Sequence, residues 1–309
     1  PDIDRYSMVA TEGNVKVLCM AAVYKDLPFV EWTVYVSNVG TSDTPLITDF
    51  RGIDINTSSM LSGKTVLHHN TGSPCRADDF QPLVSSIENE PLRFRPDDGR
   101  PSGLVLPFFN IEGIGRGVTM AVGWPGQWSA SFNAEPEGTR IIAGQETTHF
   151  VLHPGETVRS PLIAVGFYEG SWIDGQNQWR RWMVKHNIPK INGKVMPSQH
   201  AGCSSHQLNE MLNANEQNQK DFVDGYKDKK MKLDYWWMDA GWYPNNGGWY
   251  NTGTWEVDSK RFPNGLKAIS DYAKKQGVKT LVWFEPERVN EGTWLWYEKQ
   301  DWLLGHSND

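Results

Sequence analysis

The chain has 309 residues, enough for two domains, and 39% hydrophobic with 22% charged residues is typical of a globular protein. Its net charge of −7, without a clustered stripe of Lys and Arg, argues against nucleic acid and anionic membranes as partners. No apolar run is long enough to cross a bilayer, and three cysteines provide neither a disulfide framework nor a paired zinc motif. Nothing in the sequence indicates the cellular compartment.

The first half of the chain is predicted to be all-β. Runs of β-branched or alternating residues at 32–36, 118–124 and 149–152 are separated by clusters of Gly, Pro, Asn and Asp. No helical period runs long enough to compete with this pattern. Many short strands with frequent turns favour a β-sandwich over residues 1–174.

A helix is predicted where this pattern ends. Trp179, Trp182 and His186 recur at helical spacing, and Pro189 follows them as a helix terminator. We therefore assign residues 175–198 to a linker helix and the connection after it.

The remaining residues, 199–309, alternate between predicted strands and predicted helices. The strands are expected at 199–204, 233–239 and 279–285, and the helices at 216–230, 263–277 and 292–304. Such alternation indicates a parallel sheet with helical crossovers. Three strands cannot close a barrel, so we expect this part to be an incomplete domain.

Polar and aromatic side chains lie at the ends of the second and third predicted strands. Asp239 and Trp242 come at the end of the second strand, and Trp283 and Glu285 at the end of the third. Ligand sites of parallel sheets lie at the carboxyl ends of their strands. A carboxylate accepts hydrogen bonds from hydroxyl groups, and an indole face packs on the apolar face of a sugar ring. The sequence therefore predicts a sugar site at this edge.

Structural roles remain open for some of these carboxylates. Asp239 can instead cap the turn that follows its strand, as Asp often does. Of Glu285 and Glu287, one is expected to be structural and to pair with Arg288. The fifteen tryptophans of the chain likewise fit either sugar binding or core packing.

Cys203 and His206 lie at the end of the first predicted strand. A Cys or Ser beside a His can indicate nucleophilic catalysis, but no nucleophile-elbow glycines surround these residues. We therefore expect Cys203 and His206 to form a polar wall of the sugar pocket. No histidines have metal-binding spacing, so neither a metal nor another cofactor is expected.

Several segments resemble glycoside hydrolase family 36, the α-galactosidase or melibiase-like family of clan D. The segments that resemble family motifs, in the same order and spacing, are 117–128, 152–161, 179–186, 255–266, 283–287 and 301–302. The segment Trp-Phe-Glu-Pro-Glu at 283–287 matches the family motif nearly letter for letter. The resemblance implies a multidomain β plus α/β protein, with an N-terminal β-supersandwich followed by the first part of a (β/α)8 TIM barrel.

The resemblance also implies an activity. Members of the family are retaining α-glycosidases that hydrolyse terminal α-galactosides through a covalent glycosyl-enzyme intermediate. The nucleophile belongs to the fourth barrel strand and the acid/base to the sixth, so both catalytic aspartates are expected after Asp309. The 309 residues alone are therefore expected to be inactive. The expected partners are an oligosaccharide or glycoside substrate and, through the β-sandwich, further copies of the chain.

One departure from the family pattern keeps the sugar specificity open. Relatives show two consecutive aspartates at the end of the second strand, whereas Asp239 is followed by Ala240. Two alternatives therefore stand beside the α-galactosidase. The same scaffold can act on another α-glycoside, or it can be a carbohydrate-binding relative without catalysis.

Overall fold

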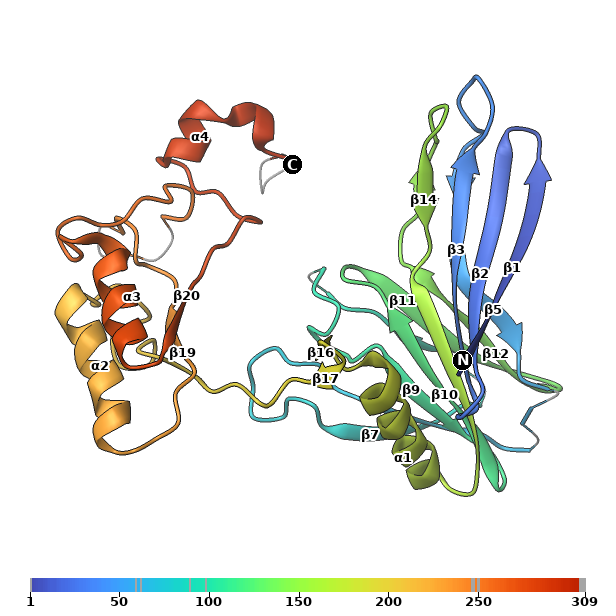
Figure 1. The fold of residues 1–309 in the computed structure, drawn as a ribbon. Helices are drawn as coiled ribbons and strands as arrows, with labels where there is room; N and C mark the ends of the chain where they lie inside the picture. Colours follow the sequence, from blue (N-terminus) through green and yellow to red (C-terminus); the bar gives the residue numbers. More distant parts are fainter. Residues whose placement is uncertain are drawn as a thin grey trace. The chain divides into compact units, whose positions relative to one another are not determined.

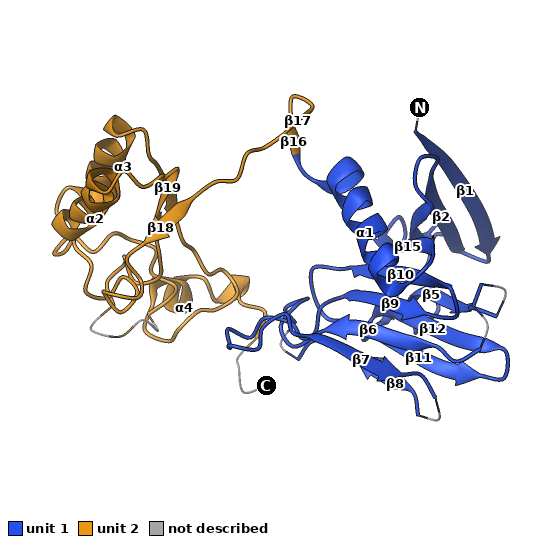
Figure 2. Ribbon diagram, turned by 90° about the horizontal axis from the view of Figure 1, so that it is seen from below, with its two compact units in different colours: residues 1–189 blue, residues 190–309 orange. Residues whose placement is uncertain are grey.

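The computed structural model describes residues 2–58, 60–61, 63–88, 90–97, 99–245, 248 and 251–305. The chain divides into two compact units, Pro1–Pro189 and Lys190–Asp309 (Figure 2). The sequence instead placed the end of the sandwich at 174 and a linker at 175–198. The helix expected in the linker thus belongs to the first unit.

The first unit is a β-sandwich. In its described residues, the larger sheet has the order β1-β2-β3-β15-β10-β9-β6-β7, with β14 paired to β3, and the smaller sheet has the order β5-β12-β11-β8. The strands of the larger sheet are β1 (Ile3–Glu12), β2 (Val15–Tyr24), β3 (Phe29–Asn38), β6 (Val66–Asn70), β7 (Pro82–Ser86), β9 (Phe108–Glu112), β10 (Arg116–Gly123), β14 (Thr157–Arg159) and β15 (Leu162–Glu169). Those of the smaller sheet are β5 (Arg51–Asn56), β8 (Leu92–Phe94), β11 (Trp128–Glu135) and β12 (Gly138–Gln145), and β4 (Ile47–Thr48) pairs with β13 (His149–Phe150).

The core of this unit lies between the two sheets. Strand β11 shows how the sequence builds it, because Trp128, Ala130 and Phe132 are buried while Ser129 and Ser131, which alternate with them, are only partly buried. The buried residues pack with Ile111 and Met120 of the larger sheet. The Trp128 indole N–H donates to the carbonyl oxygen of Pro101 at 2.8 Å, so its one polar atom is satisfied inside the core.

The helix that the sequence assigned to the linker packs on the larger sheet. Helix α1 (Trp172–Trp182) contacts β9, β10 and β15. The carboxylate of Asp174 accepts hydrogen bonds from the N–H and hydroxyl groups of Ser171 and so caps the helix start. The rings of Trp182 and Phe29 stack with centroids 4.8 Å apart. A π-helical turn (Met183–Asn187) follows, and the helical region ends before Pro189 as expected.

The second unit contains a three-stranded parallel sheet among its described residues, in the order β18-β19-β20. Its elements are a short hairpin of β16 (Lys190–Ile191) and β17 (Lys194–Val195), then β18 (Ala201–Cys203), α2 (Glu216–Asp228), β19 (Tyr235–Met238), α3 (Gly265–Lys275), β20 (Lys279–Val282), α4 (Trp294–Glu298) and a 3-10 turn (Gln300–Trp302). Helices α2 and α3 lie side by side (Figure 1). The predicted alternation of strand and helix is present.

The two faces of the parallel sheet differ in burial. Trp236 and Met238 are fully buried in a core with residues of α2 and α3, and the Trp236 indole N–H donates to Gln219 of α2 at 3.0 Å. Trp237 alternates to the opposite face, where it is paired in register with Leu281. These two side chains are 37% and 45% exposed. The face of the sheet that carries Trp237 and Leu281 is therefore less buried than the face that packs on α2 and α3.

We expect Trp128→Ala to lower the free energy of unfolding by about 3–5 kcal/mol, because it leaves a large cavity in a fully packed core. Urea denaturation of the chain measures the change. Val84→Ala, at a residue that is 63% exposed, is the control and should change the free energy by less than about 0.5 kcal/mol. Equal effects of the two substitutions would remove Trp128 from the core.

Candidate functional site

Asp239 lies directly after β19, at the carboxyl end of the parallel sheet. One of its carboxylate oxygens accepts a hydrogen bond from the hydroxyl group of Ser205 at 2.5 Å, and the other accepts from the backbone N–H of Ala240 at 2.8 Å. Ser205 follows β18, so this contact joins the ends of two neighbouring strands. Asp239 is half-buried and thus caps the turn and also presents its carboxylate at the sheet edge. The turn-capping interpretation describes the contact with Ala240, and a sugar contact of Asp239 stays a prediction.

Glu285 forms an ion pair with Arg288, with 2.6 Å between the carboxylate oxygen and the guanidinium nitrogen. The glutamate side chain is 16% exposed. Of the two glutamates considered from the sequence, Glu285 is therefore the one that pairs with Arg288, and Glu287 is exposed. The charges of the pair also act on the carboxyl group of Glu210.

Glu210 was missed in the sequence and belongs to this group of charges. Its backbone has a φ of 56°, a left-handed conformation that is rare for Glu, and its N–H donates to the carbonyl oxygen of Ser205 at 2.7 Å. Burial raises the pKa of its carboxyl group, and the negative charge of Asp239 raises it further, while Arg288 lowers it. No periodic pattern marks Glu210, because it lies in a polar loop, so only the folded chain brings it near Asp239.

The two predicted tryptophans occupy different environments. Trp242 is 3% exposed, and its ring packs edge-on against Tyr243 and Phe284. Its indole N–H donates to the carbonyl oxygen of Trp283 at 2.9 Å. Trp283 itself is only partly buried and contacts the ring of Trp255. Trp242 thus ties the β19 and β20 strand ends together from within the core, and a sugar contact of either ring stays a prediction.

Cys203 and His206 line a pocket of about 480 Å³ beside helix α2, together with Phe222 and Tyr226. Cys203 pairs in register with Trp237, and its thiol is free. Asp239 does not line this pocket. The structure therefore gathers Asp239, Glu285 and Arg288 near Glu210, and places His206 in a separate, neighbouring pocket. The expected pocket wall made by Cys203 and His206 stays a prediction.

Residues 210–309 match the melibiase family model. The α-galactosidase Mel36A of Lactobacillus acidophilus is 38% identical over 91 residues, which are 29% of this chain and 12% of that protein. α-Galactosidase 1 of Pediococcus pentosaceus is 31% identical over 154 residues, 50% of this chain and 20% of that protein. The chain thus spans at most about a fifth of the length of these two relatives.

Two solved structures share the fold over the whole chain. The galactosidase domain of the α-galactosidase-sucrose kinase AgaSK aligns with a TM-score of 0.80 at 16% identity, over 100% of this chain and 43% of that one. The family 36 α-galactosidase AgaA from Geobacillus stearothermophilus aligns with a TM-score of 0.79 at 14% identity, with the same coverage. The predicted fold class is confirmed by these two likenesses, and the resemblance to the family 36 α-galactosidases is confirmed. The segment matched by the melibiase model contains Glu210, Asp239 and Glu285, and begins after Cys203 and His206.

Two further findings concern only the part of the chain that the structure describes. No helix there has the length and apolar character needed to cross a membrane. No three His, Cys, Asp or Glu side chains there are grouped so that they could hold a metal ion.

The raised pKa of Glu210 predicts how stability depends on pH. A carboxyl group whose pKa is higher in the folded than in the unfolded chain stabilises the fold when the pH is below its pKa in the unfolded chain, taken as 4.5. That contribution is lost as the pH rises from there through the raised folded value. Glu210→Gln cannot ionise, so we expect its melting temperature to fall less than that of the unmodified protein across this window.

Thermal unfolding of both proteins in matched buffers from pH 4 upward measures the difference. The exposed Glu256→Gln serves as a control in the same unit. It should retain the pH dependence of the unmodified protein. Parallel curves for Glu210→Gln and the unmodified protein would contradict the burial of this carboxyl group near Asp239.

Proposed function

We propose that the full-length protein is a glycoside hydrolase that acts on terminal α-galactosides. The observation that carries the proposal is the match of residues 210–309 to the melibiase family, since this segment holds the charged group at the sheet edge. Two relatives named α-galactosidases support the same activity, and so do two solved structures with the same fold, one of a galactosidase domain and one of a family 36 α-galactosidase. A variant of AgaA has been solved in complex with raffinose and another with stachyose, which supports an oligosaccharide as the substrate here.

The proposed reaction retains the anomeric configuration through a covalent glycosyl-enzyme intermediate. Such a reaction needs two carboxyl groups about 5 Å apart, one as nucleophile and one as acid/base. We assign neither role to Asp239, Glu285 or Glu210. Their proposed role is to bind the sugar at the nonreducing end, because carboxylates accept the hydroxyl hydrogen bonds that orient it.

A different α-glycoside is the second candidate, and Ala240 is the observation that favours it. This residue occupies the place of the second aspartate of the family pattern and is 2% exposed, so it offers no polar group to a sugar. A panel of nitrophenyl α-glycosides, including galactoside, glucoside and N-acetylgalactosaminide, distinguishes the candidates with the full-length protein. Turnover of the galactoside above all others supports the proposal. Sugar binding without turnover of any glycoside would instead support a non-catalytic relative.

Asp239→Asn should lower kcat/KM for the preferred glycoside at least about tenfold in the full-length protein. The amide keeps the shape of the side chain but loses its charge and one acceptor, and about 1.4 kcal/mol corresponds to a factor of ten. Steady-state kinetics measure the change.

Asp234→Asn is the matched control, because Asp234 precedes the same strand and pairs with Lys232 at 3.0 Å. It lies at the amino end of β19 and should leave kcat/KM within about twofold. An equal loss of activity in the two variants would point to damage to β19 and not to a sugar contact.

We also propose that copies of the chain associate through the sandwich. The edge strand β1 exposes Tyr6 and Met8 on one face, at 59% and 71%, and a long edge strand with exposed apolar side chains is a site for pairing with another chain. Met8→Lys should therefore shift the full-length protein toward smaller species in sedimentation velocity. Ile114→Lys, at an equally exposed apolar residue between β9 and β10, is the control and should leave the distribution unchanged. Unchanged sedimentation of Met8→Lys would exclude this edge as the interface.

A further inference from the structure

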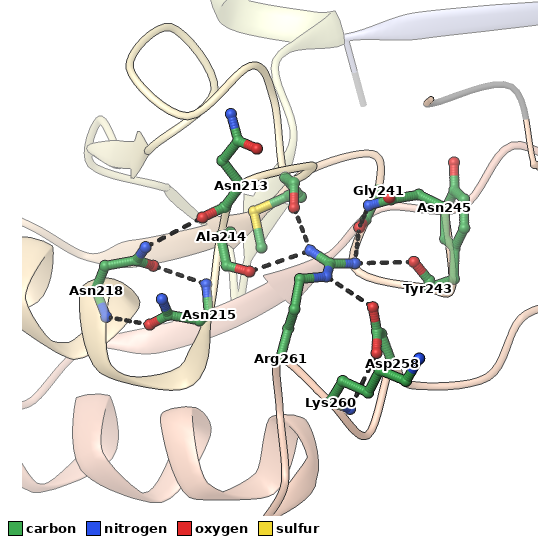
Figure 3. A network of polar contacts seen from close by, with 11 residues as sticks. Asn213, Ala214, Asn215, Asn218, Gly241, Tyr243, Asn245, Asp258, Lys260 and Arg261 are labelled. Atoms are coloured by element: carbon green, nitrogen blue, oxygen red, sulfur yellow. Dashed lines mark hydrogen bonds and ion pairs between the residues drawn. The ribbon is translucent and has the colours of Figure 1, made fainter. Parts of the chain in front are cut away.

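Arg261 lies in the segment between β19 and α3, and its guanidinium group is the centre of a network of polar contacts (Figure 3). Its nitrogens donate to four backbone carbonyl oxygens and one carboxylate, those of Met211 (2.5 Å), Ala214 (3.1 Å), Gly241 (2.6 Å), Tyr243 (2.9 Å) and Asp258 (2.7 Å). The side chain is 17% exposed. A planar guanidinium with five N–H donors is suited to such a set of acceptors, whereas an ammonium group has three donors at one point.

The four carbonyl groups belong to two loops. Met211 and Ala214 lie in residues 204–215, here called the β18 loop, and Gly241 and Tyr243 lie in residues 239–245, here called the β19 loop. The two loops also touch directly, because the N–H of Met211 donates to the carbonyl oxygen of Ala240 at 2.8 Å. The guanidinium group therefore clamps two loops that already meet. Glu210 immediately precedes one of the clamped carbonyl groups, and Asp239 precedes Gly241 by two residues.

The guanidinium group is itself held in place. Asp258 accepts from Arg261 and from the backbone N–H of Lys260 at 3.0 Å, and its own N–H donates to the carbonyl oxygen of Trp242. Burial disfavours the ionised form of Asp258, but the hydrogen bonds from Arg261 and Lys260 outweigh burial and lower its pKa. The hydrogen bonds thus favour the negatively charged form of Asp258 although the side chain is partly buried. A guanidinium group that is charged and held in one orientation can set the distance between the two loops.

We propose that Arg261 is a positioning residue that fixes the β18 loop against the β19 loop, so that Glu210 and Asp239 keep one mutual arrangement for binding the sugar. This inference rests on the proposed sugar-binding role of the two carboxyl groups. Arg261 acts through backbone carbonyls and does not itself contact the substrate. Because a misplacement of about 1 Å at an active site can lower a rate about a hundredfold, the clamp affects activity even where the fold survives.

The test compares Arg261→Lys with Arg140→Lys in the full-length protein. Arg140 also bonds a carboxylate, Asp54, through two nitrogens at 2.8 and 2.9 Å, but on an exposed surface of the sandwich. We expect Arg261→Lys to lower kcat/KM for nitrophenyl α-galactoside at least about tenfold. Arg140→Lys should stay within about twofold of the unmodified protein, since exposed ion pairs contribute little.

Hydrogen exchange supplies a readout that does not depend on activity. In Arg261→Lys the amides of the β18 and β19 loops should exchange faster, while those of α2 and α3 keep the protection of the unmodified protein. Unchanged kcat/KM together with unchanged exchange in both loops would overturn the proposal. A uniform loss of protection that includes α2 and α3 would also overturn it, because Arg261 would then stabilise the whole unit and not the loops.

Asp258→Asn keeps the guanidinium group of Arg261 and removes only the charge that anchors it, so it tests the proposal even if Arg261→Lys fails to fold. We expect a smaller fall in kcat/KM and faster exchange confined to the same two loops, and no change in either would overturn the proposal. If the unmodified protein turns over no α-glycoside, the proposed function fails by that result alone. The exchange measurements on the two loops then still decide whether Arg261 clamps them.

Discussion

The parallel register of β18, β19 and β20 is the constraint on which the rest of the second unit depends. Backbone hydrogen bonds align Cys203 with Trp237 and Trp237 with Leu281, so the three strands run in one direction. The residues that come after each strand therefore emerge at one edge, although they are far apart in the sequence. Ser205 reaches Asp239 across this edge, and Trp242 reaches the backbone of Trp283. The charged group around Asp239 is a consequence of that alignment.

Burial on one face of the same sheet fixes the strand whose end carries Asp239. Trp236 and Met238 have no exposed surface and pack with Val223 of α2 and Ile269 of α3, so β19 is fixed by apolar contact on its helical side. The loops beyond the strands contribute to the same core through Met211, Ala214, Trp242 and Tyr243. Arg261, which is partly buried, adds hydrogen bonds to backbone oxygens of both loops. Packing thus fixes the strands, and packing together with the guanidinium group of Arg261 fixes the loops at their carboxyl ends.

The sequence predicted the architecture better than the details of the site, and particular residues show why. Alternating and β-branched runs of residues indicate directly which face of a strand is buried, so the sandwich and the order of strands and helices could be predicted. The strand ends could not be predicted. Strand β20 stops at Val282 because its partner β19 stops at Met238, and the sequence of one strand does not show the length of its partner. Glu210 carries no pattern, since its position depends on a left-handed turn. The two environments of Trp242 and Trp283 likewise arise from packing with segments that are distant in sequence.

The charges at the sheet edge are unbalanced, and this imbalance shapes what the site can bind. Three carboxyl groups, of Glu210, Asp239 and Glu285, share one described guanidinium, that of Arg288, which pairs with Glu285. Ionisation of all three would place like charges together in a partly buried site, and burial together with the charge of Asp239 raises the pKa of the Glu210 carboxyl group. A protonated carboxyl group donates a hydrogen bond as well as accepting one, whereas a carboxylate only accepts. Sugar hydroxyls do both, so in the proposed sugar-binding role a carboxyl group that donates and a neighbouring carboxylate that accepts would contact two adjacent hydroxyls.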